Sequence, residues 1–159
     1  MGRIRRILFV CTGNMCRSPM AEGIMKDLVD SGGEGGMVVS SAGTWACVDE
    51  SPPAEAMEVC AENGIDISRH RAKQLTDKMV RDSDHILVME GLHLQKIIDR
   101  VPEASGKVRM LGTFTGGAIT VLDQEIPDPY GGSASDYREC FEGLKRHIEA
   151  FAKTLCRPR

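Results

Sequence analysis

Residues 10–19 of the chain read Val-Cys-Thr-Gly-Asn-Met-Cys-Arg-Ser-Pro, and an apolar run at residues 7–10 leads into them. A short, continuously apolar run is typical of a strand that is buried on both faces. The pair Ser18-Pro19 predicts the start of a helix, with Ser18 as the N-cap and Pro19 at the first helical position. Residues 11–17, hereafter the anion loop, therefore connect a strand to a helix, as in an α/β fold.

The rest of the chain repeats this alternation of strands and helices. Three further β-rich apolar runs occur at residues 37–41, 85–89 and 108–111. Helical periodicity occurs at residues 19–31, 53–63, 91–100 and 135–155. This alternation predicts an α/β fold with a four-stranded parallel sheet flanked by helices on both faces. Because we find no linker, repeat or low-complexity stretch, we expect a single domain over residues 1–159.

The anion loop combines the groups that a tetrahedral oxyanion requires. It follows the carboxyl end of a strand, where parallel sheets bind ligands. Gly13 and Asn14 tolerate unusual backbone angles, so the N–H groups of the loop can point inward. Arg17 adds a planar charged fork, and the helix start adds partial positive charge. The same field favours the thiolate of Cys11, a candidate nucleophile. The expected phosphate-binding residues are Thr12, Gly13, Asn14, Met15, Cys16 and Arg17.

Composition narrows the class of protein. The net charge is −3, and the basic residues Arg3, Arg5 and Arg6 flank a strand, which argues against nucleic acid as the main partner. No window approaches the roughly 18 apolar residues of a membrane span.

Six irregularly spaced cysteines without an export signal predict a reducing, cytoplasmic location. With no C-x-x-C pair and scattered histidines, we expect no metal and no cofactor. The oligomeric state stays open, with a monomer as the working expectation.

The sequence of the anion loop resembles the signature loop of the low-molecular-weight protein tyrosine phosphatases, in their bacterial form. Further stretches similar to this family occur at residues 41–44, 63–65, 70–74, 84–89 and 126–130. The resemblance therefore runs the length of the chain. It implies a Rossmann-like three-layer α/β sandwich that hydrolyses phosphorylated protein substrates without a metal.

A second catalytic group is needed because a phenolate, whose conjugate acid has a pKa of about 10, leaves slowly unless it is protonated. From the residues alone, Asp123, Glu125 and Asp128 are all candidates, and an Asp-Pro pair can equally open a turn. The resemblance selects Asp128 as the general acid and as the later base. It also implies that Cys11 is the nucleophile and that Arg17 binds the phosphate.

The resemblance further implies a supporting network and a substrate pocket. The network residues are Asn14, Ser18, Ser41 and His70, and the pocket residues are Met15, Trp45 and Tyr130. Taken alone, His70 reads as a solvated histidine and Ser41 as an ordinary strand-end serine. Trp45 and Tyr130 are two of only seven aromatic residues, and both fall in expected loops near the site. On its own, Trp45 can instead pack on a nearby proline.

Met15 leaves the substrate class open. Residues 131–133 read Gly-Gly-Ser where many eukaryotic members carry a second tyrosine, which resembles bacterial members. These include a protein-arginine-phosphatase branch that shares the Cys-Thr-Gly-Asn start of the loop. That branch carries threonine at the position of Met15, and a thioether cannot donate a hydrogen bond. Phosphotyrosine is therefore expected, with phosphoarginine as the alternative.

Cys16 is a candidate redox residue because it lies in the same tight loop as Cys11. A reversible disulfide between the two would protect the nucleophile, provided that the strict geometry of the bond is met. The resemblance supports this role, and a buried structural thiol is the alternative.

Two rival functions share the anion loop. An arsenate reductase of the thioredoxin-coupled type relays electrons through two more cysteines after the third strand, but residues 79–110 contain none. A non-catalytic phosphate-binding module requires neither the thiol of Cys11 nor the carboxyl group of Asp128. The intact set of residues therefore favours an enzyme.

Overall fold

The computed structural model describes residues 3–32, 35–115 and 124–155. Within these residues, four strands form one parallel sheet in the order β2-β1-β3-β4. The strands are β1 (Arg5–Cys11), β2 (Met37–Gly43), β3 (His85–Val88) and β4 (Val108–Met110). The helices are α1 (Arg17–Gly32), α2 (Ala54–Glu62), α3 (Asp77–Asp82), α4 (Gly91–Arg100) and α5 (Ala134–Leu155), with short 3-10 helices η1 (Pro102–Ala104) and η2 (Leu111–Thr113).

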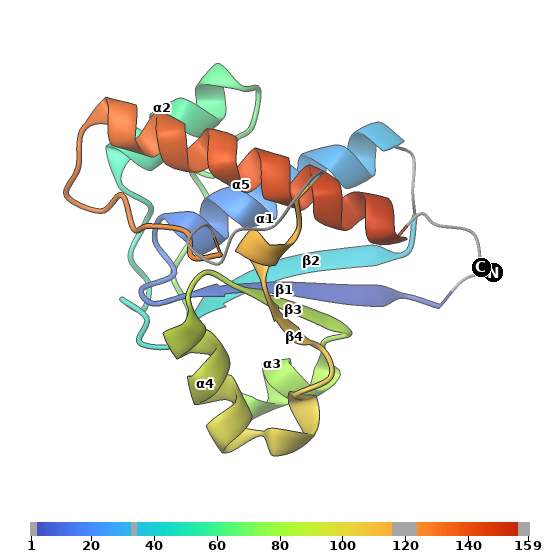
Figure 1. Cartoon of the computed structure of the whole chain (residues 1–159). Helices are drawn as coiled ribbons and strands as arrows, with labels where there is room; N and C mark the ends of the chain where they lie inside the picture. Colours follow the sequence, from blue (N-terminus) through green and yellow to red (C-terminus); the bar gives the residue numbers. More distant parts are fainter. Residues whose placement is uncertain (1–2, 33–34, 116–123, 156–159) are drawn as a thin grey trace.

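The sheet lies between two layers of helices, as Figure 1 shows. Helices α1, α2 and α5 cover one face, and α3 and α4 cover the other. The parallel strand order and the three layers confirm the fold expected from the sequence. In such a fold the chain leaves each strand at the same edge of the sheet, where the loops can meet.

Strand β1 is central, and its alternating side chains contribute to two separate cores. Ile7, Phe9 and Cys11 pack in the cluster on the side of α1 and α5. Leu8 and Val10 pack in the cluster on the side of α4. Burial on both faces explains why the run is continuously apolar rather than alternating. It also places the Cys11 side chain on the α1 side of the sheet.

The start of α1 corrects one expectation. The helix begins at Arg17, so Ser18 is its second residue and not the N-cap, and Pro19 is its third. The first N–H groups of a helix have no acceptor within the helix, so proline is tolerated there as well as at the first position. The Ser18 hydroxyl is consequently free for a different partner.

Helix α3 was not expected from the sequence. It has only six residues, too few to show helical periodicity, and it begins where the Thr76 hydroxyl accepts the N–H of Met79. The bounds of the other expected elements differ from the sequence prediction by no more than two residues.

Candidate active site

The anion loop connects the carboxyl end of β1 to α1, and strand β2 supports it from one side (Figure 1). Cys11 is in register with Gly43 of β2. Beyond this pair, Thr44 N–H donates to Cys11 O at 2.9 Å and Trp45 N–H donates to Thr12 O at 3.0 Å. A Cβ atom on Gly43 would lie 2.4 Å from Thr12 O, so only glycine permits this close approach.

The sulfur of Cys11 is buried among hydrogen-bond donors. Its residue is 2% exposed, and Ser18 Oγ lies 2.8 Å from Sγ. The backbone N–H of Asn14 donates to the same sulfur at 3.3 Å. Both contacts, together with the amino end of α1, direct hydrogen-bond donors and partial positive charge at the Cys11 sulfur. This arrangement can therefore hold a nucleophilic sulfur.

Asn14 is the centre of the supporting network. Its backbone is left-handed, with φ at +58°, and its side chain is fully buried. Nδ2 donates to Ser18 Oγ at 2.8 Å and to Ser41 Oγ at 3.0 Å, while Oδ1 accepts the N–H of Lys73 at 2.9 Å. His70 Nε2 lies 2.9 Å from Asn14 O and donates to it, because a carbonyl can only accept. Burial is the main cause that lowers the pKa of His70 below 6.5.

Each of the two serines in the network accepts one hydrogen bond and can donate another. Ser18 and Ser41 each accept an amide hydrogen from Asn14, so their own hydroxyl hydrogens remain for other acceptors. Ser41 donates to Glu22 Oε1 at 2.7 Å, and Ser18 can donate to the Cys11 sulfur. Glu22 was missed from the sequence because a glutamate in an amphipathic helix reads as a surface residue.

Arg17 joins the anion loop to the segment that carries Asp128. Its side chain is 2% exposed, and Nη1 donates to Ile126 O at 2.8 Å. The same nitrogen lies 3.0 Å from Glu90 Oε2, and Nη2 lies 3.7 Å from Asp128 Oδ2. Glu90 lies two residues after the end of β3 and was also missed, since nothing in the local sequence connects it to the loop. The structure thus brings Asp128 to the guanidinium group of Arg17.

The other candidates for the general acid are placed differently. Glu125 Oε1 accepts the N–H of Gly91 at 3.3 Å, at the start of α4. Asp123 lies outside the described residues. Of the two candidates that the structure describes, Asp128 is the one beside Arg17, and its side chain is half exposed to solvent.

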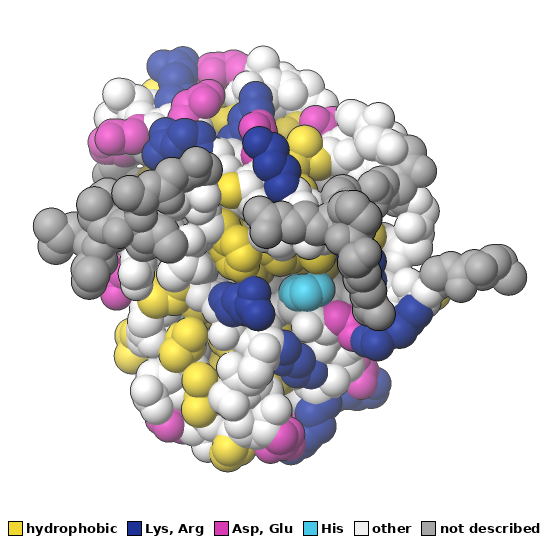
Figure 2. Space-filling view, turned by 45° about the vertical axis from the view of Figure 1, so that its right-hand side comes forward, with side chains coloured by type: hydrophobic (Ala, Val, Ile, Leu, Met, Phe, Trp, Pro, Cys, Tyr) yellow, Lys and Arg dark blue, Asp and Glu magenta, His cyan; other side chains and the backbone are white. Residues whose placement is uncertain are grey.

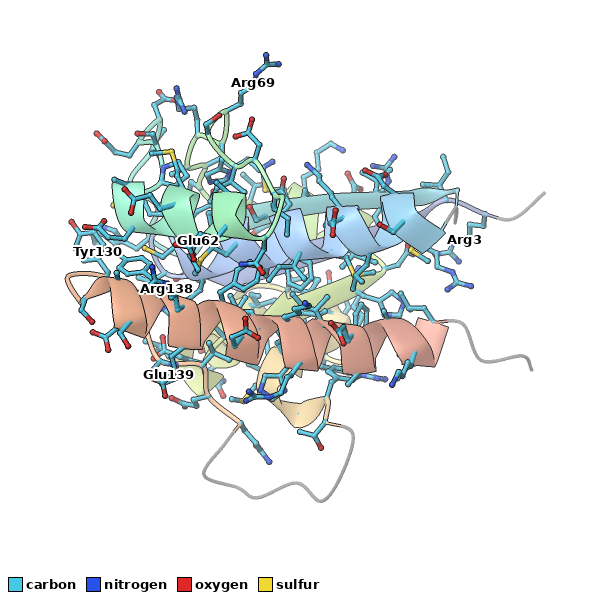
Figure 3. All side chains as sticks on the ribbon, turned by 90° about the horizontal axis from the view of Figure 1, so that it is seen from above. Arg3, Glu62, Arg69, Tyr130, Arg138 and Glu139 are labelled. Carbon is cyan, nitrogen blue, oxygen red and sulfur yellow. The ribbon has the colours of Figure 1, made fainter. Side chains whose placement is uncertain are left out.

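Two exposed aromatic residues flank the site. Trp45 is 76% exposed and follows β2, with its N–H bonded to the anion loop. Tyr130 is 65% exposed, and its N–H donates to Asp128 Oδ1 at 3.1 Å. Figure 3 shows Tyr130 at the end of the molecule opposite to Arg3. Met15 is half-buried and packs against the core on the α1 side.

Cys16 is buried, unlike a typical reactive thiol. Its sulfur lies 3.7 Å from the hydroxyl of Tyr137 on α5. Burial, the largest effect, raises the pKa of Cys16 to about 12. Cys47, by contrast, is exposed, and its N–H donates to Gly13 O at 3.1 Å. Cys47, which was not singled out from the sequence, therefore places an exposed thiol next to the anion loop.

Basic and acidic side chains are mixed on the face drawn in Figure 2. Within residues 3–32, 35–115 and 124–155, no group of three or more His, Cys, Asp or Glu side chains could hold a metal ion. No helix in the described part of the chain is long and apolar enough to cross a membrane.

Comparison with known proteins identifies the family. Residues 6–159 match the family described as low molecular weight phosphotyrosine protein phosphatase. The low molecular weight protein-tyrosine-phosphatase Etp of Escherichia coli K12 is 34% identical over 98% of this chain and 97% of its own. A protein-arginine-phosphatase of Geobacillus stearothermophilus is 37% identical over 94% of this chain and 95% of its own.

A solved structure agrees with these sequence matches. The tyrosine phosphatase Wzb from Escherichia coli K30, in complex with sulphate, is 33% identical, with a TM-score of 0.83 over 96% of this chain and 99% of that one. Fold and site together define an α/β protein in which a loop around a buried cysteine connects the central strand to a helix. The chain belongs to the low molecular weight phosphotyrosine protein phosphatase family.

Proposed function

We propose that the protein hydrolyses phosphotyrosine in proteins, with Cys11 as the nucleophile, Arg17 as the phosphate-binding residue and Asp128 as the general acid and base. The observation that carries this proposal is the Cys11 sulfur, 2.8 Å from Ser18 Oγ at the amino end of α1. Binding of phosphate alone would not need such a sulfur. The relative Wzb was solved with sulphate, a tetrahedral oxyanion like phosphate.

In the first step, the Cys11 thiolate attacks phosphorus. An S–P bond forms, the ester P–O bond breaks, and the departing phenolate takes a proton from the Asp128 carboxyl group. The N–H groups of the anion loop and the guanidinium fork of Arg17 bind the equatorial oxygens. The products of this step are a cysteinyl-phosphate and free tyrosine hydroxyl.

In the second step, water attacks the cysteinyl-phosphate. The Asp128 carboxylate takes a proton from the water, the new P–O bond forms, and the S–P bond breaks. Cys11 leaves as a thiolate, and the hydroxyl of Ser18, 2.8 Å from the sulfur, donates to it. Inorganic phosphate then departs and the enzyme is regenerated.

Turnover of para-nitrophenyl phosphate near pH 5–6 tests the proposal. The reduced protein should hydrolyse this ester, and Cys11→Ser should abolish the reaction. Cys47→Ser is the matched control, since it removes an exposed thiol beside the same loop and should retain activity. Absence of turnover in the intact, reduced protein would favour a phosphate-binding module.

Phosphoarginine is the second candidate substrate. The chain is 37% identical to a protein-arginine-phosphatase, and it begins the anion loop with the Cys-Thr-Gly-Asn sequence noted above. Met15, however, supplies no hydroxyl for a phosphoarginine pocket, whereas a pocket with Met15, Trp45 and Tyr130 as its walls would suit a phenyl ring. Hydrolysis of matched phosphotyrosine and phosphoarginine peptides decides between the two, and faster release of phosphate from phosphoarginine would overturn the choice.

The remaining expectations concern the setting of the protein. We propose that residues 1–159 act as one domain and as a monomer, in the cytoplasm. Five free cysteines in the described residues support a reducing location. Light scattering after gel filtration tests the monomer, and cell fractionation tests the location.

A further inference from the structure

His93 is a fully buried histidine that the proposed reaction does not use. It is the third residue of α4, whose N-cap is Glu90. The two residues form a reciprocal capping box: the Glu90 side chain accepts the N–H of His93, and the N–H of Glu90 donates to His93 Nδ1 at 3.1 Å. A backbone N–H can only donate, so Nδ1 of this ring carries no proton.

This cap determines the tautomer of the ring. With Nδ1 as an acceptor, the neutral imidazole carries its hydrogen on Nε2. His93 Nε2 lies 2.9 Å from Thr12 Oγ1, in the anion loop, so Nε2–H donates to that hydroxyl oxygen. Burial and the nearby Arg17 lower the pKa of His93 to about 4, which keeps the ring neutral.

We propose that His93 is a positioning residue for phosphoryl transfer: its Nε2–H holds the Thr12 side chain and so fixes the first turn of the anion loop. The proposal rests on the proposed function. Asn14 holds the loop through residues on the α1 side and in the segment around residue 70. His93 contacts it from α4, which covers the opposite face of the sheet (Figure 1). The loop is therefore held from both faces.

The same cap also connects this contact to Arg17. Glu90 Oε2 lies 3.5 Å from His93 Nε2 and 3.0 Å from Arg17 Nη1. Thr12 and Arg17, near the two ends of the anion loop, are thus held by neighbouring groups at the start of one helix. A change in the orientation of His93 would move the loop relative to the guanidinium group.

Two substitutions separate the cap from the contact with Thr12. His93→Asn keeps an acceptor near Nδ1 for the Glu90 N–H but loses the donor to Thr12. His93→Gln keeps a donor near Nε2 but loses the acceptor for the cap. We expect His93→Asn to reduce kcat/KM for a phosphotyrosine peptide about tenfold, and to raise the Kd of inorganic phosphate. His93→Gln should remain within about threefold of the unsubstituted protein, even where its Tm falls.

Thr12 provides the matched test at the other end of the bond. Thr12→Val, which removes the acceptor with little change in shape, should reproduce the effect of His93→Asn. In the Thr12→Val background, His93→Asn should cause no further loss of kcat/KM, because the two substitutions remove the same hydrogen bond.

The results separate this inference from the proposed function. Equal losses in His93→Asn and His93→Gln that follow their Tm values, or full activity in Thr12→Val, would overturn the positioning role. If the unsubstituted protein shows no turnover, the Kd of inorganic phosphate from calorimetry remains as the readout. A weaker affinity in His93→Asn but not in His93→Gln would then support the positioning role, while unchanged affinity in both would refute it.

Discussion

Arg17 donates a hydrogen bond across 2.8 Å to the main-chain oxygen of Ile126, two residues before Asp128. This bond connects the guanidinium group of Arg17, the proposed phosphate-binding residue, to the segment that carries Asp128, the proposed general acid. A buried guanidinium group with several donors can keep this carbonyl while it turns other N–H groups to a phosphoryl group. The three N–H donors of lysine share one nitrogen, so they cannot reach the Ile126 carbonyl and also present a planar fork to a phosphoryl group.

Arg17→Lys should therefore lower kcat/KM for para-nitrophenyl phosphate by about 10²–10³-fold, the cost of losing a preorganised donor in an active site. The loss should appear mainly in kcat, because the transition state needs the fork more than the ground state does. Arg138→Lys is the control: Arg138 forms a surface ion pair with Glu62 at 3.0 Å, far from Cys11 in sequence, and should leave kcat unchanged (Figure 3). Similar kinetics for Arg17→Lys and the control would contradict the assignment.

Asp128→Ala should slow the hydrolysis of esters with poor leaving groups far more than that of activated esters. A phenolate from phenyl phosphate needs the proton that Asp128 supplies, whereas a nitrophenolate departs more readily without it. We expect a loss of about 10²–10⁴-fold for phenyl phosphate and a clearly smaller loss for para-nitrophenyl phosphate. Steady-state rates for a series of substituted phenyl phosphates give the measurement. Equal slowing across the series would remove Asp128 from the role of general acid.

Substitutions of Asn14 should separate its hydrogen bonds from its backbone strain. Both Asn14→Ala and Asn14→Gly remove the side-chain bonds to the two serines and to the Lys73 N–H, so both should lose most activity. Only alanine carries a Cβ atom that opposes the left-handed φ of +58°. We expect Asn14→Ala to be about 1 kcal/mol less stable than Asn14→Gly in urea unfolding. Equal stabilities would mean that the loop has relaxed in both variants.

Stability should fall as the pH drops from about 6.5 towards 4. The pKa of His93 is lowered to about 4 in the folded protein, mainly by burial, against an ordinary value of 6.5, and burial also lowers the pKa of His70. Between these values the unfolded chain binds more protons than the folded protein does. The contribution of the two histidines to the free energy of unfolding is therefore complete above about pH 6.5 and is progressively lost below it. His93 alone accounts for up to about 3 kcal/mol of this loss.

Urea midpoints at pH 7, 5.5 and 4.5 measure this loss, and His93→Gln should reduce the slope. Carboxylates with lowered pKa values, such as Asp84, are protonated in the unfolded chain only below about pH 4, so they act in a lower window. A midpoint that does not change between pH 7 and 5 would show that neither histidine is buried in its neutral form.

We expect Cys16 to protect Cys11 from oxidation, but slowly. Peroxide converts a thiolate to a sulfenic acid, which a second thiolate can attack to form a disulfide with loss of hydroxide. Because the pKa of Cys16 is raised to about 12, few Cys16 thiolates exist at neutral pH. Recovery of activity with dithiothreitol after a short and a long peroxide pulse gives the test, in a Cys47→Ser background to remove the exposed thiol. Full recovery in Cys16→Ser would exclude the protective role.

The sequence was informative where function depends on local spacing. Cys11 and Arg17 could be placed at the end of a strand and the start of a helix because both ends of the loop carry their own signals. Ser18 shows the limit of such signals. Its sequence context is that of an N-cap, but in the structure its buried hydroxyl lies 2.8 Å from the Cys11 sulfur and accepts a hydrogen bond from Asn14, because a buried hydroxyl needs such partners.

The missed residues share a different cause. Lys73 is held against the end of β2, Glu90 and His93 lie at the start of α4, and Glu22 of α1 bonds Ser41 of β2, so each contact depends on tertiary packing. No periodicity in the sequence encodes such contacts. Lys73 contributes a backbone N–H alone, so its side chain carries no signal at all. The parts of the site that could not be predicted are therefore those that depend on tertiary register.

The close approach of Gly43 to Thr12 O and the bond from Lys73 to Asn14 have a consequence for the refolding kinetics of the enzyme. The loop reaches its final shape only when chain segments dozens of residues downstream have docked. Loop closure over such distances is slower than the formation of a helix. Recovery of turnover after dilution from denaturant should therefore lag behind the far-ultraviolet signal of α1 and α5. Catalytic activity is, in this fold, a late reporter of complete assembly.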